Sequence, residues 1–382
     1  MNTPNIRFKG YTDDWEQRKV IDIAPLQRGF DLPTTEMKPG EYPVVMSNGI
    51  GGWHSEYKAK GPGVITGRSG TIGKLHYVES DYWPHNTTLW VTDFKGNNPK
   101  FVYHLYDRLD LSRFGTGSGV PTLNRNDVHD TKVDIPAYEE QKKIADYLDG
   151  LDNLITLHQR KCDDLQEVKK YMLQKLFPQN GAKIPEIRFA GFTGEWEQRK
   201  LGEVFEQTTN YVNPAEDEVE LWSLTVEAGL TPKTERYNRE FLVKKDDNFK
   251  EVRPGDIVYN PMNMTLGAVG YNGMAKSVAV SGYYTTMIAK DGYDSYYINT
   301  WLKSPQAILL YKNYATGTLI EKQRVQFPTL STIPASFPEF EEQKQIGAYF
   351  ANLDNLIALH QRKCDDLKEF KKFMLQNMFP EG

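Results

Sequence analysis

One stretch of the chain resembles a phosphate-binding loop. Residues 67–75 read GRSGTIGKL, which is close to the pattern G-x-x-x-x-G-K-[ST]. Arg68 stands where the first glycine belongs, and Leu75 stands where a hydroxyl should contact Mg²⁺. Because glycines also permit tight backbone turns, we interpret this stretch as a β-hairpin.

Other motifs of catalysis are also incomplete. Asn260-Pro261-Met262-Asn263 falls short of the Asn/Asp-Pro-Pro-Tyr/Phe signature of amino-methyltransferases. The 7 histidines form no H-E-x-x-H motif, and no serine stands in a G-x-S-x-G nucleophile elbow. We therefore expect the chain itself to perform no catalysis.

Two histidines and two cysteines could meet at one zinc ion. His158 precedes Cys162 by four residues, and His360 precedes Cys364 in the same way. Such pairs on separate helices are not a usual zinc-finger spacing. We interpret the histidines as hydrogen-bonded across a helix interface and the cysteines as small apolar residues beside them, so no metal site is predicted.

Length and composition indicate a soluble protein of two or three domains. The 382 residues exceed the roughly 100–200 of an ordinary domain. Two cysteines cannot build a disulfide scaffold and suit a reducing cytoplasm. No apolar run approaches the ~18 residues of a membrane span, and the N-terminus lacks an apolar signal core. The formal net charge of −5 gives no basic signature of nucleic-acid binding.

The chain contains two copies of one framework. Residues 6–19 match residues 187–200 at 10 of 14 positions, and residues 136–178 match residues 338–380 at 29 of 43 positions. The intervening segments are much less alike. Closely similar frames around divergent inserts indicate a common framework that carries two different specificities.

The longer repeat has the heptad pattern of a coiled coil. Apolar residues recur at alternating steps of three and four, and only Lys169 and Lys371 interrupt them. About 38 residues would form a helix of roughly 57 Å, which ends before Pro178 or Pro380. The predicted seam residues are Ile144, Leu148, Leu151, Ile155, His158, Cys162, Leu165, Ile346, Phe350, Leu353, Ile357, His360, Cys364 and Leu367. We expect the two helices to pair antiparallel, with the variable domains at opposite ends and related by an approximate two-fold axis.

The variable segments are predicted to be mixed α/β domains. Strands are expected at residues 42–46, 87–91 and 277–280, and helical stretches at 101–106 and 298–302. The predicted fold class is therefore α+β, with two mixed domains separated by a long antiparallel two-helix coiled coil. The predicted segments are an N-terminal arm (1–19), a first variable domain (20–135), a first helix (136–178), a linker with the second arm (179–200), a second variable domain (201–337) and a second helix (338–380).

The order of these motifs resembles the specificity (S) subunits of type I restriction–modification systems. The first copy begins with Trp15-Glu16-Gln17-Arg18-Lys19 and continues after the variable segment with EEQKKI at 139–144, LDNLI at 151–155 and KKYMLQ at 169–174. The pattern recurs from Trp196 to Gln376, so the resemblance covers nearly the full chain. Departures lie within the variable segments.

This resemblance implies a function. The variable segments would be target recognition domains, each reading one half of a split double-stranded DNA site. The helices would set the gap and dock two modification (M) subunits, which bind S-adenosylmethionine and methylate adenine N6. Restriction (R) subunits, which use ATP and Mg²⁺, would join to cleave DNA. The S subunit itself would perform no chemistry.

Candidate DNA contacts are polar residues that loops could present to base edges. In the first variable segment they are Lys58, Lys60, Arg68, Thr71, Lys74, Ser118, Asn124 and Arg125. In the second they are Thr231, Lys233, Thr234, Arg236, Asn263, Thr265, Thr318 and Arg324.

Two other functions stay open at this point. A coiled-coil scaffold that binds only proteins would explain the helices but not the two divergent domains. A self-sufficient DNA methyltransferase or nuclease would need a further segment of about 150 residues, for which the chain has no room.

Overall fold

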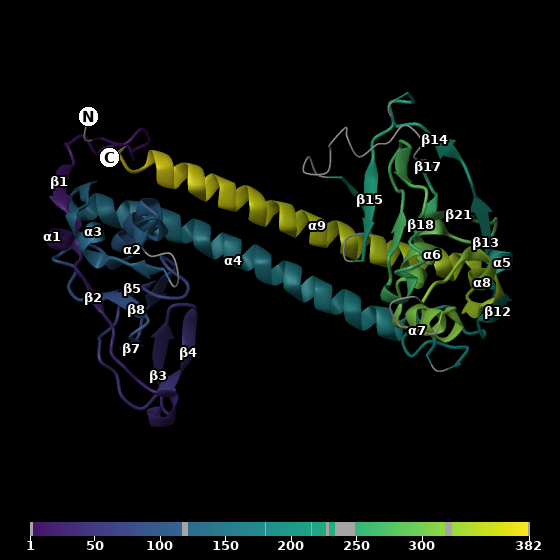
Figure 1. The fold of residues 1–382 in the computed structure, drawn as a ribbon, viewed down its shortest axis with the longest axis horizontal. Helices are drawn as coiled ribbons and strands as arrows, with labels where there is room; N and C mark the ends of the chain where they lie inside the picture. Colours follow the sequence, from purple (N-terminus) through teal and green to yellow (C-terminus); the bar gives the residue numbers. More distant parts are fainter. Residues whose placement is uncertain are drawn as a thin grey trace. The chain divides into compact units, whose positions relative to one another are not determined.

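The computed structural model describes residues 3–116, 121–179, 181–214, 216–226, 229–233, 249–317 and 323–380. The chain divides into two compact units: unit 1 comprises Met1–Arg160 and Gln361–Gly382, and unit 2 comprises Lys161–His360. Each unit includes part of both long repeats. Both ends of the chain belong to unit 1 (Figure 1).

Unit 1 contains a four-stranded antiparallel sheet, in the order β2-β8-β5-β6, and a three-stranded sheet in the order β4-β3-β7. A separate pair, β1 and β11, joins the arm to the end of the variable segment. The strands are β1 (Glu16–Lys19), β2 (Leu26–Arg28), β3 (Tyr42–Met46), β4 (Gly49–His54), β5 (Gly63–Gly67), β6 (Leu75–Val78), β7 (Trp83–Pro84), β8 (Thr88–Val91), β9 (Gly115–Thr116), β10 (Thr122–Leu123) and β11 (Lys132–Ile135). The short helices are α1 (Val20–Ile23), α2 (Pro99–Leu109) and α3 (Arg125–Asp130), with 3-10 turns at Thr34–Glu36 and Leu111–Phe114.

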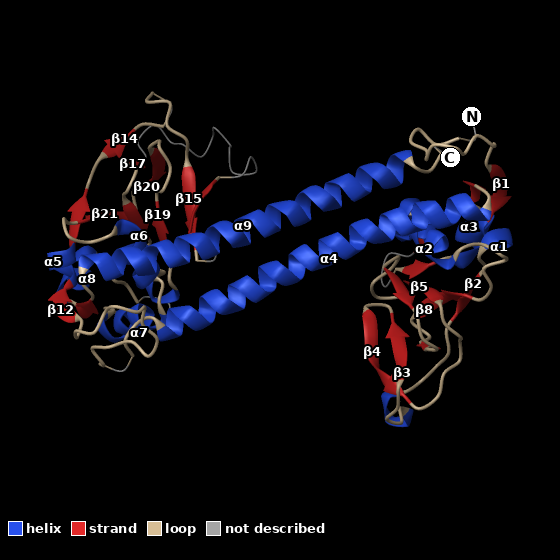
Figure 2. Ribbon diagram, turned by 180° about the vertical axis from the view of Figure 1, so that it is seen from behind, coloured by secondary structure: helices blue, strands red, loops and turns tan. Residues whose placement is uncertain are grey.

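Helix α2 connects the sheet to the long helix. The Asn98 side chain accepts hydrogen bonds from the backbone N–H groups of Lys100 and Phe101, and Pro99 takes the first helical position. Phe101 and Leu105 pack into the unit 1 core. His104 contacts Asp149 of the long helix α4 (Tyr138–Lys175), so α2 lies between α4 and the sheet (Figure 2).

Unit 2 repeats this plan with different inserts. Its four-stranded antiparallel sheet has the order β13-β21-β18-β19, beside a three-stranded sheet β14-β17-β20 and the hairpin β15-β16. The strands are β12 (Glu197–Lys200), β13 (Phe205–Thr208), β14 (Tyr211–Val212), β15 (Trp222–Thr225), β16 (Gly229–Pro232), β17 (Phe249–Val252), β18 (Ile257–Tyr259), β19 (Val269–Tyr271), β20 (Val278–Ser281), β21 (Thr285–Ala289) and β22 (Pro334–Phe337). The helices are α5 (Leu201–Val204), α6 (Ser295–Leu302), α7 (Pro305–Tyr314) and α8 (Phe327–Thr332), with a 3-10 turn at Met264–Leu266.

The local elements predicted from the sequence are confirmed. The expected strands correspond to β3, β8 and β20, and the expected helical stretches lie within α2 and α6. The stretch that resembles a phosphate loop joins β5 to β6 in an antiparallel hairpin, as predicted.

The two long helices, α4 (Tyr138–Lys175) and α9 (Phe340–Asn377), have 38 residues each. In unit 1, Asp152 of α4 contacts Lys371 of α9, and Gln159 contacts Cys364. As the residue number increases along α4, the number of its contact residue on α9 decreases, so the two segments are antiparallel in this unit. In unit 2, Lys169 contacts Asp354 and Phe177 stacks on Phe350. The two segments are therefore antiparallel in this unit as well.

Some of the predicted seam residues are fully buried and the others are half-buried. The buried seam residues are Ile144, Leu148, Leu151, Cys162, Ile346, Phe350, Leu353 and Cys364. The half-buried ones are Ile155, His158, Leu165, Ile357, His360 and Leu367.

The two lysines that interrupt the heptads form ion pairs across the helices. Lys371, 13% exposed, donates to Asp152 at 2.9 Å and to Asp107 at 3.2 Å. Burial lowers the pKa of Lys371, but these carboxylates raise it above its ordinary value overall. At the same position of the other repeat, Lys169 pairs with Asp354. Sliding either helix would leave a partly buried charge without its partner, so these pairs select one alignment.

Reversing one charge should expose this role. Asp152→Lys places two positive charges together, and we expect it to destabilise unit 1 by about 2 kcal/mol, between the values typical of surface and buried pairs. Because Asp107 would repel a carboxylate at position 371, the compensated variant neutralises it as well. Asp152→Lys/Lys371→Asp/Asp107→Asn should recover more than half of the loss in urea unfolding of the full chain. A compensated variant no more stable than Asp152→Lys would show that the pair does not select the alignment.

Each short arm is held by a buried glutamate of the long helix. Arg7 donates to both carboxylate oxygens of Glu140 at 2.7 and 2.8 Å, and Arg188 donates to both of Glu342 at 2.7 Å. The two glutamates are 2% and 0% exposed. Bidentate pairs of this kind fix orientation as well as position.

The next residue of each helix holds the variable domain. Gln141 accepts a hydrogen bond from the backbone N–H of Asn98 and donates to the Pro136 carbonyl. Gln343 makes the corresponding bonds with Asp294 and Pro338. The duplicated Glu-Gln pair therefore fastens both the arm and the variable domain to the helix.

Candidate nucleic-acid interface

In unit 1, three loops converge at one end of the four-stranded sheet. Gly67 at the end of β5 is paired with Thr88 at the start of β8, so the loop 68–74 and the turn 85–87 lie together. The Arg68 N–H donates to the Thr87 carbonyl at 2.8 Å. The returning segment joins them, because the Leu123 N–H donates to the Arg68 carbonyl at 2.8 Å.

The turn of the β3–β4 hairpin completes this end of unit 1. The Ser47 N–H donates to the Thr87 hydroxyl at 3.3 Å, and Lys74 Nζ donates to the Asn48 carbonyl at 3.0 Å. Asn48 was not predicted as a contact residue. Asn48 is exposed and its backbone carbonyl is bonded to the predicted Lys74, a contact that only the tertiary pairing of two hairpins creates.

The predicted contacts of the first variable domain fall into three groups. Arg68, Thr71 and Lys74 lie together in the β5–β6 loop, with Arg68 half-buried and the other two exposed. Lys58 and Lys60 are exposed in a different segment, where Lys58 Nζ lies 5.0 Å from the centre of the Trp83 ring. Ser118 lies outside the described residues.

Asn124 has a structural role in this unit. Its side-chain oxygen caps α3 by accepting from the Asn126 N–H at 3.1 Å, and its amide donates to Asp127 at 2.8 Å. Both polar atoms of Asn124 are therefore engaged within the fold. Arg125, the first residue of α3, is exposed.

Unit 2 has the equivalent convergence. Tyr259 at the end of β18 is paired with Thr285 at the start of β21, so the loop 260–268 lies beside the turn 282–284. The Val325 N–H donates to the Pro261 carbonyl at 2.9 Å, as Leu123 does to Arg68 in unit 1. Matched frames thus bring different loops to the same end of each sheet.

The predicted contacts of the second variable domain are also divided. Asn263 and Arg324 are exposed at the convergent end, whereas Thr265 is only 9% exposed. Thr231 and Lys233 are half-buried, in and just after β16. Thr234, Arg236 and Thr318 lie outside the described residues.

Large exposed side chains at the unit 2 end were missed from the sequence. Met262, Leu266 and Tyr283 are 52%, 60% and 89% exposed. Aromatic and apolar residues give no charge signal, and their exposure depends on which strands pair. The alignment of Tyr284-Thr285-Thr286 with Asn86-Thr87-Thr88 was the available signal for this turn.

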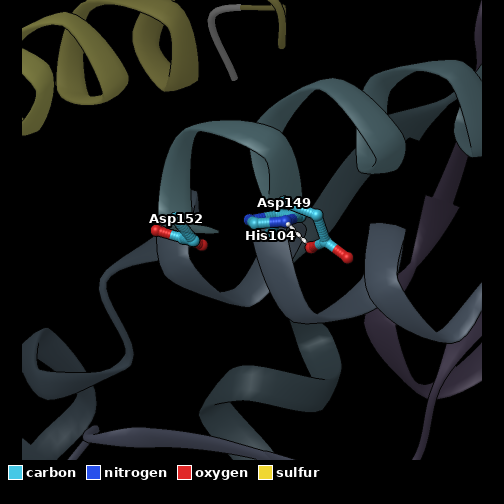
Figure 3. Close-up of side chains that lie close together, drawn as sticks. All are labelled: His104, Asp149 and Asp152. Atoms are coloured by element: carbon cyan, nitrogen blue, oxygen red, sulfur yellow. Dashed lines mark hydrogen bonds and ion pairs between the residues drawn. The ribbon is translucent and has the colours of Figure 1, made fainter. Parts of the chain in front are cut away.

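One cluster has residue types that could hold a metal ion. Figure 3 shows His104 of α2 beside Asp149 and Asp152 of α4, with His104 Nε2 2.8 Å from an Asp149 oxygen. Lys100 lies 2.6 Å from Asp149, and Lys371 lies 2.8 Å from Asp152. Burial raises the pKa of Asp149, but the hydrogen bonds from His104 and Lys100 lower it overall. Both carboxylates are thus engaged by cations of the protein, which makes the cluster an ion-pair network between α2 and the long helices.

Two mixed domains on matched frames, each with its own set of loops at one sheet end, define a duplicated recognition module. The family model described as "Type I restriction modification DNA specificity domain" matches residues 12–167 and again residues 193–369. The chain therefore belongs to the family of type I restriction–modification specificity subunits.

Individual relatives agree with this assignment. The specificity subunit of the type I restriction enzyme MjaVIII of Methanocaldococcus jannaschii is 24% identical over 271 residues, which are 67% of this chain and 63% of that protein. The specificity subunit of the Escherichia coli enzyme EcoprrI is 26% identical over 114 residues, which are 30% of this chain and 28% of that protein. The match with each spans less than two thirds of the relative.

A solved structure shares the fold. The crystal structure of the S subunit of a type I restriction–modification system from M. genitalium aligns over 100% of both chains, with a TM-score of 0.70 and 12% identity. Among the described residues, no helix has the length and apolar character needed to cross a bilayer.

Proposed function

We propose that this chain is the DNA-recognition subunit of a type I restriction–modification complex, in which each unit reads one half of a bipartite site. The observation that carries this proposal is the pair of convergent sheet ends. Each is built on the same pattern of strand pairing, closed by the same backbone bond, and lined by different side chains. A scaffold that binds only proteins gives no reason for two different sets of loops on one framework.

The long helices have the features of a spacer. A continuous antiparallel coiled coil of α4 and α9, with the two units related by an approximate two-fold axis, would hold the readers a fixed distance apart. Half-sites on one face of DNA repeat every ~34 Å turn, so the helix length would set the gap between them.

The chemistry belongs to partners in this proposal. Two methyltransferase subunits carry S-adenosylmethionine and modify adenine N6, and restriction subunits with ATP and Mg²⁺ cleave DNA in the cytoplasm. The specificity chain performs no catalysis. Because the net charge of the chain is −5, we expect partner subunits to supply many of the cationic contacts to DNA phosphates. The isolated chain should therefore bind DNA weakly at moderate salt.

Domain exchange tests the proposal. Residues 20–135 are replaced by the equivalent segment of another family member, and methylated adenines are mapped by sequencing genomic DNA from cells that express the complex. We expect one half-site to change while the other half-site and the gap are retained. A second exchange, of residues 201–337, should change the other half only. Unchanged methylation in an exchanged complex that still methylates DNA would contradict DNA reading by these domains.

A further inference from the structure

Tyr283 lies in the tight turn between β20 and β21 and is 89% exposed. The turn is closed by a hydrogen bond from the Tyr284 N–H to the Ser281 carbonyl at 3.0 Å. Turns favour glycine, asparagine, aspartate and serine for their backbone conformations and local hydrogen bonds. Gly282 meets that need here, and the ring of Tyr283 gains little burial from folding. Folding therefore does not explain an aromatic ring at this position.

The turn is held in place from the neighbouring strand. Lys250 of β17 is half-buried and donates through Nζ to the Tyr284 carbonyl at 2.7 Å. Tyr211 of β14 is the register partner of Lys250 and is 63% exposed. Two exposed tyrosines thus flank one lysine that fixes the backbone beneath them.

The corresponding turn of unit 1 lacks this feature. His85 is half-buried and hydrogen-bonded to the Thr87 hydroxyl at 3.0 Å. Asn86, the next residue, is also half-buried. The framework therefore does not require an exposed ring at this turn.

We propose that Tyr283 stacks on a base of the half-site read by unit 2, with Tyr211 as a second aromatic contact. This inference rests on the proposed DNA-recognition function. Lys250 is a positioning residue, since its ammonium group is bonded to the turn. The ring lies at the same sheet end as the exposed Asn263 and Arg324, which can contact base edges and phosphates. In a duplex the faces of each base are covered by its neighbours, so the ring would reach a base face by entering a partly unstacked base step, as apolar and aromatic wedges do.

The test uses the assembled complex of this chain with its methyltransferase subunits. A DNA duplex carrying the site found by methylation mapping is labelled with 2-aminopurine at successive positions of the unit 2 half-site. Tyr283→Ala should weaken binding by about 5- to 150-fold, the range for loss of one stacked base. It should also abolish the fluorescence change at one position, while Tyr283→Phe and Tyr283→Trp keep both. Tyr138→Ala removes an exposed tyrosine at the start of α4, 48% exposed and outside the candidate DNA contacts, and serves as the matched control with unchanged binding.

Salt dependence separates stacking from charge. Tyr283→Ala should leave the slope of log K against log salt unchanged, whereas Arg324→Ala, if Arg324 contacts a phosphate, should reduce it by about 0.9. Wild-type-like affinity and fluorescence in Tyr283→Ala would overturn the stacking proposal while leaving DNA recognition intact. Loss of a methyltransferase subunit from the Tyr283→Ala complex would overturn it in favour of a protein contact. Absence of site-specific binding by the wild-type complex would instead contradict the proposed function.

Discussion

Replacing Glu342 with alanine is expected to lower the free energy of unfolding of unit 2 by about 3–5 kcal/mol, the cost of breaking a buried ion pair by removing one partner. Glu342 is fully buried, and Arg188, whose side chain is 14% exposed, donates two hydrogen bonds to it. The variant leaves a largely buried guanidinium without a counter-charge. Because Arg188 belongs to the arm, we also expect the arm to separate from the helix.

The neighbouring residue provides the matched control. Glu341 is 71% exposed and pairs with Lys344 on the surface, so Glu341→Ala should cost less than about 1 kcal/mol. Urea unfolding gives both values, and limited proteolysis near residue 188 reports release of the arm. Equal stability of the Glu341→Ala and Glu342→Ala variants would contradict the role assigned to the buried pair. Glu140→Ala should repeat the effect in unit 1, where Arg7 is the partner.

The helices and hairpins could be predicted because their signals are local and periodic. The heptads of residues 136–178 and 338–380 specify two helices wherever the rest of the chain goes. Glycines 67, 70 and 73 mark a turn between two apolar runs, and the structure places the β5–β6 hairpin there. In each case neighbouring residues contain the whole signal.

The composition of the candidate site could be predicted only in part, because the site depends on strand pairing. Asn48 and Lys74 are brought together from separate hairpins, and no pattern along the chain relates them. Asn124 is of a residue type that can contact a base, but its side-chain oxygen already accepts the hydrogen bond that caps α3. Lys371 interrupts a heptad in the sequence, and only the fold shows Asp152 opposite it. Residue type identifies what a side chain can do, whereas the tertiary fold decides which groups are already occupied.

If the methyltransferase subunits proposed above dock on the long helices, we expect them to bind at the exposed apolar residues of these helices. Four of them lie in unit 1 and four at the same repeat positions in unit 2. They are Leu154, Leu157, Phe370 and Phe373 in unit 1, and Val168, Tyr171, Leu356 and Leu359 in unit 2, all between 43% and 51% exposed. Leu154 and Phe370 each precede a seam position by one residue, so they flank the same side of the antiparallel pair. Exposed apolar residues that cluster on one face are typical of protein-binding surfaces.

Introducing charges into the exposed apolar residues of one unit should remove one methyltransferase subunit from the complex. We expect Leu154→Asp/Phe370→Asp to weaken binding of one subunit by more than about 100-fold, because each variant would bury an unpaired carboxylate in an apolar interface. Val168→Asp/Leu356→Asp should remove the other subunit. Light scattering after size-exclusion chromatography gives the mass of each assembly.

The control variant keeps the helices and changes exposed polar positions of the same two repeats. Glu167→Ala/Glu369→Ala should retain both methyltransferase subunits, since neither glutamate is one of the exposed apolar residues. Full assembly of both Asp variants would contradict docking at these apolar residues. Loss of one subunit per variant, and of both when the variants are combined, would show that the duplicated sequence supplies one docking surface per unit, and hence that the number of methyltransferase subunits follows from the number of repeats.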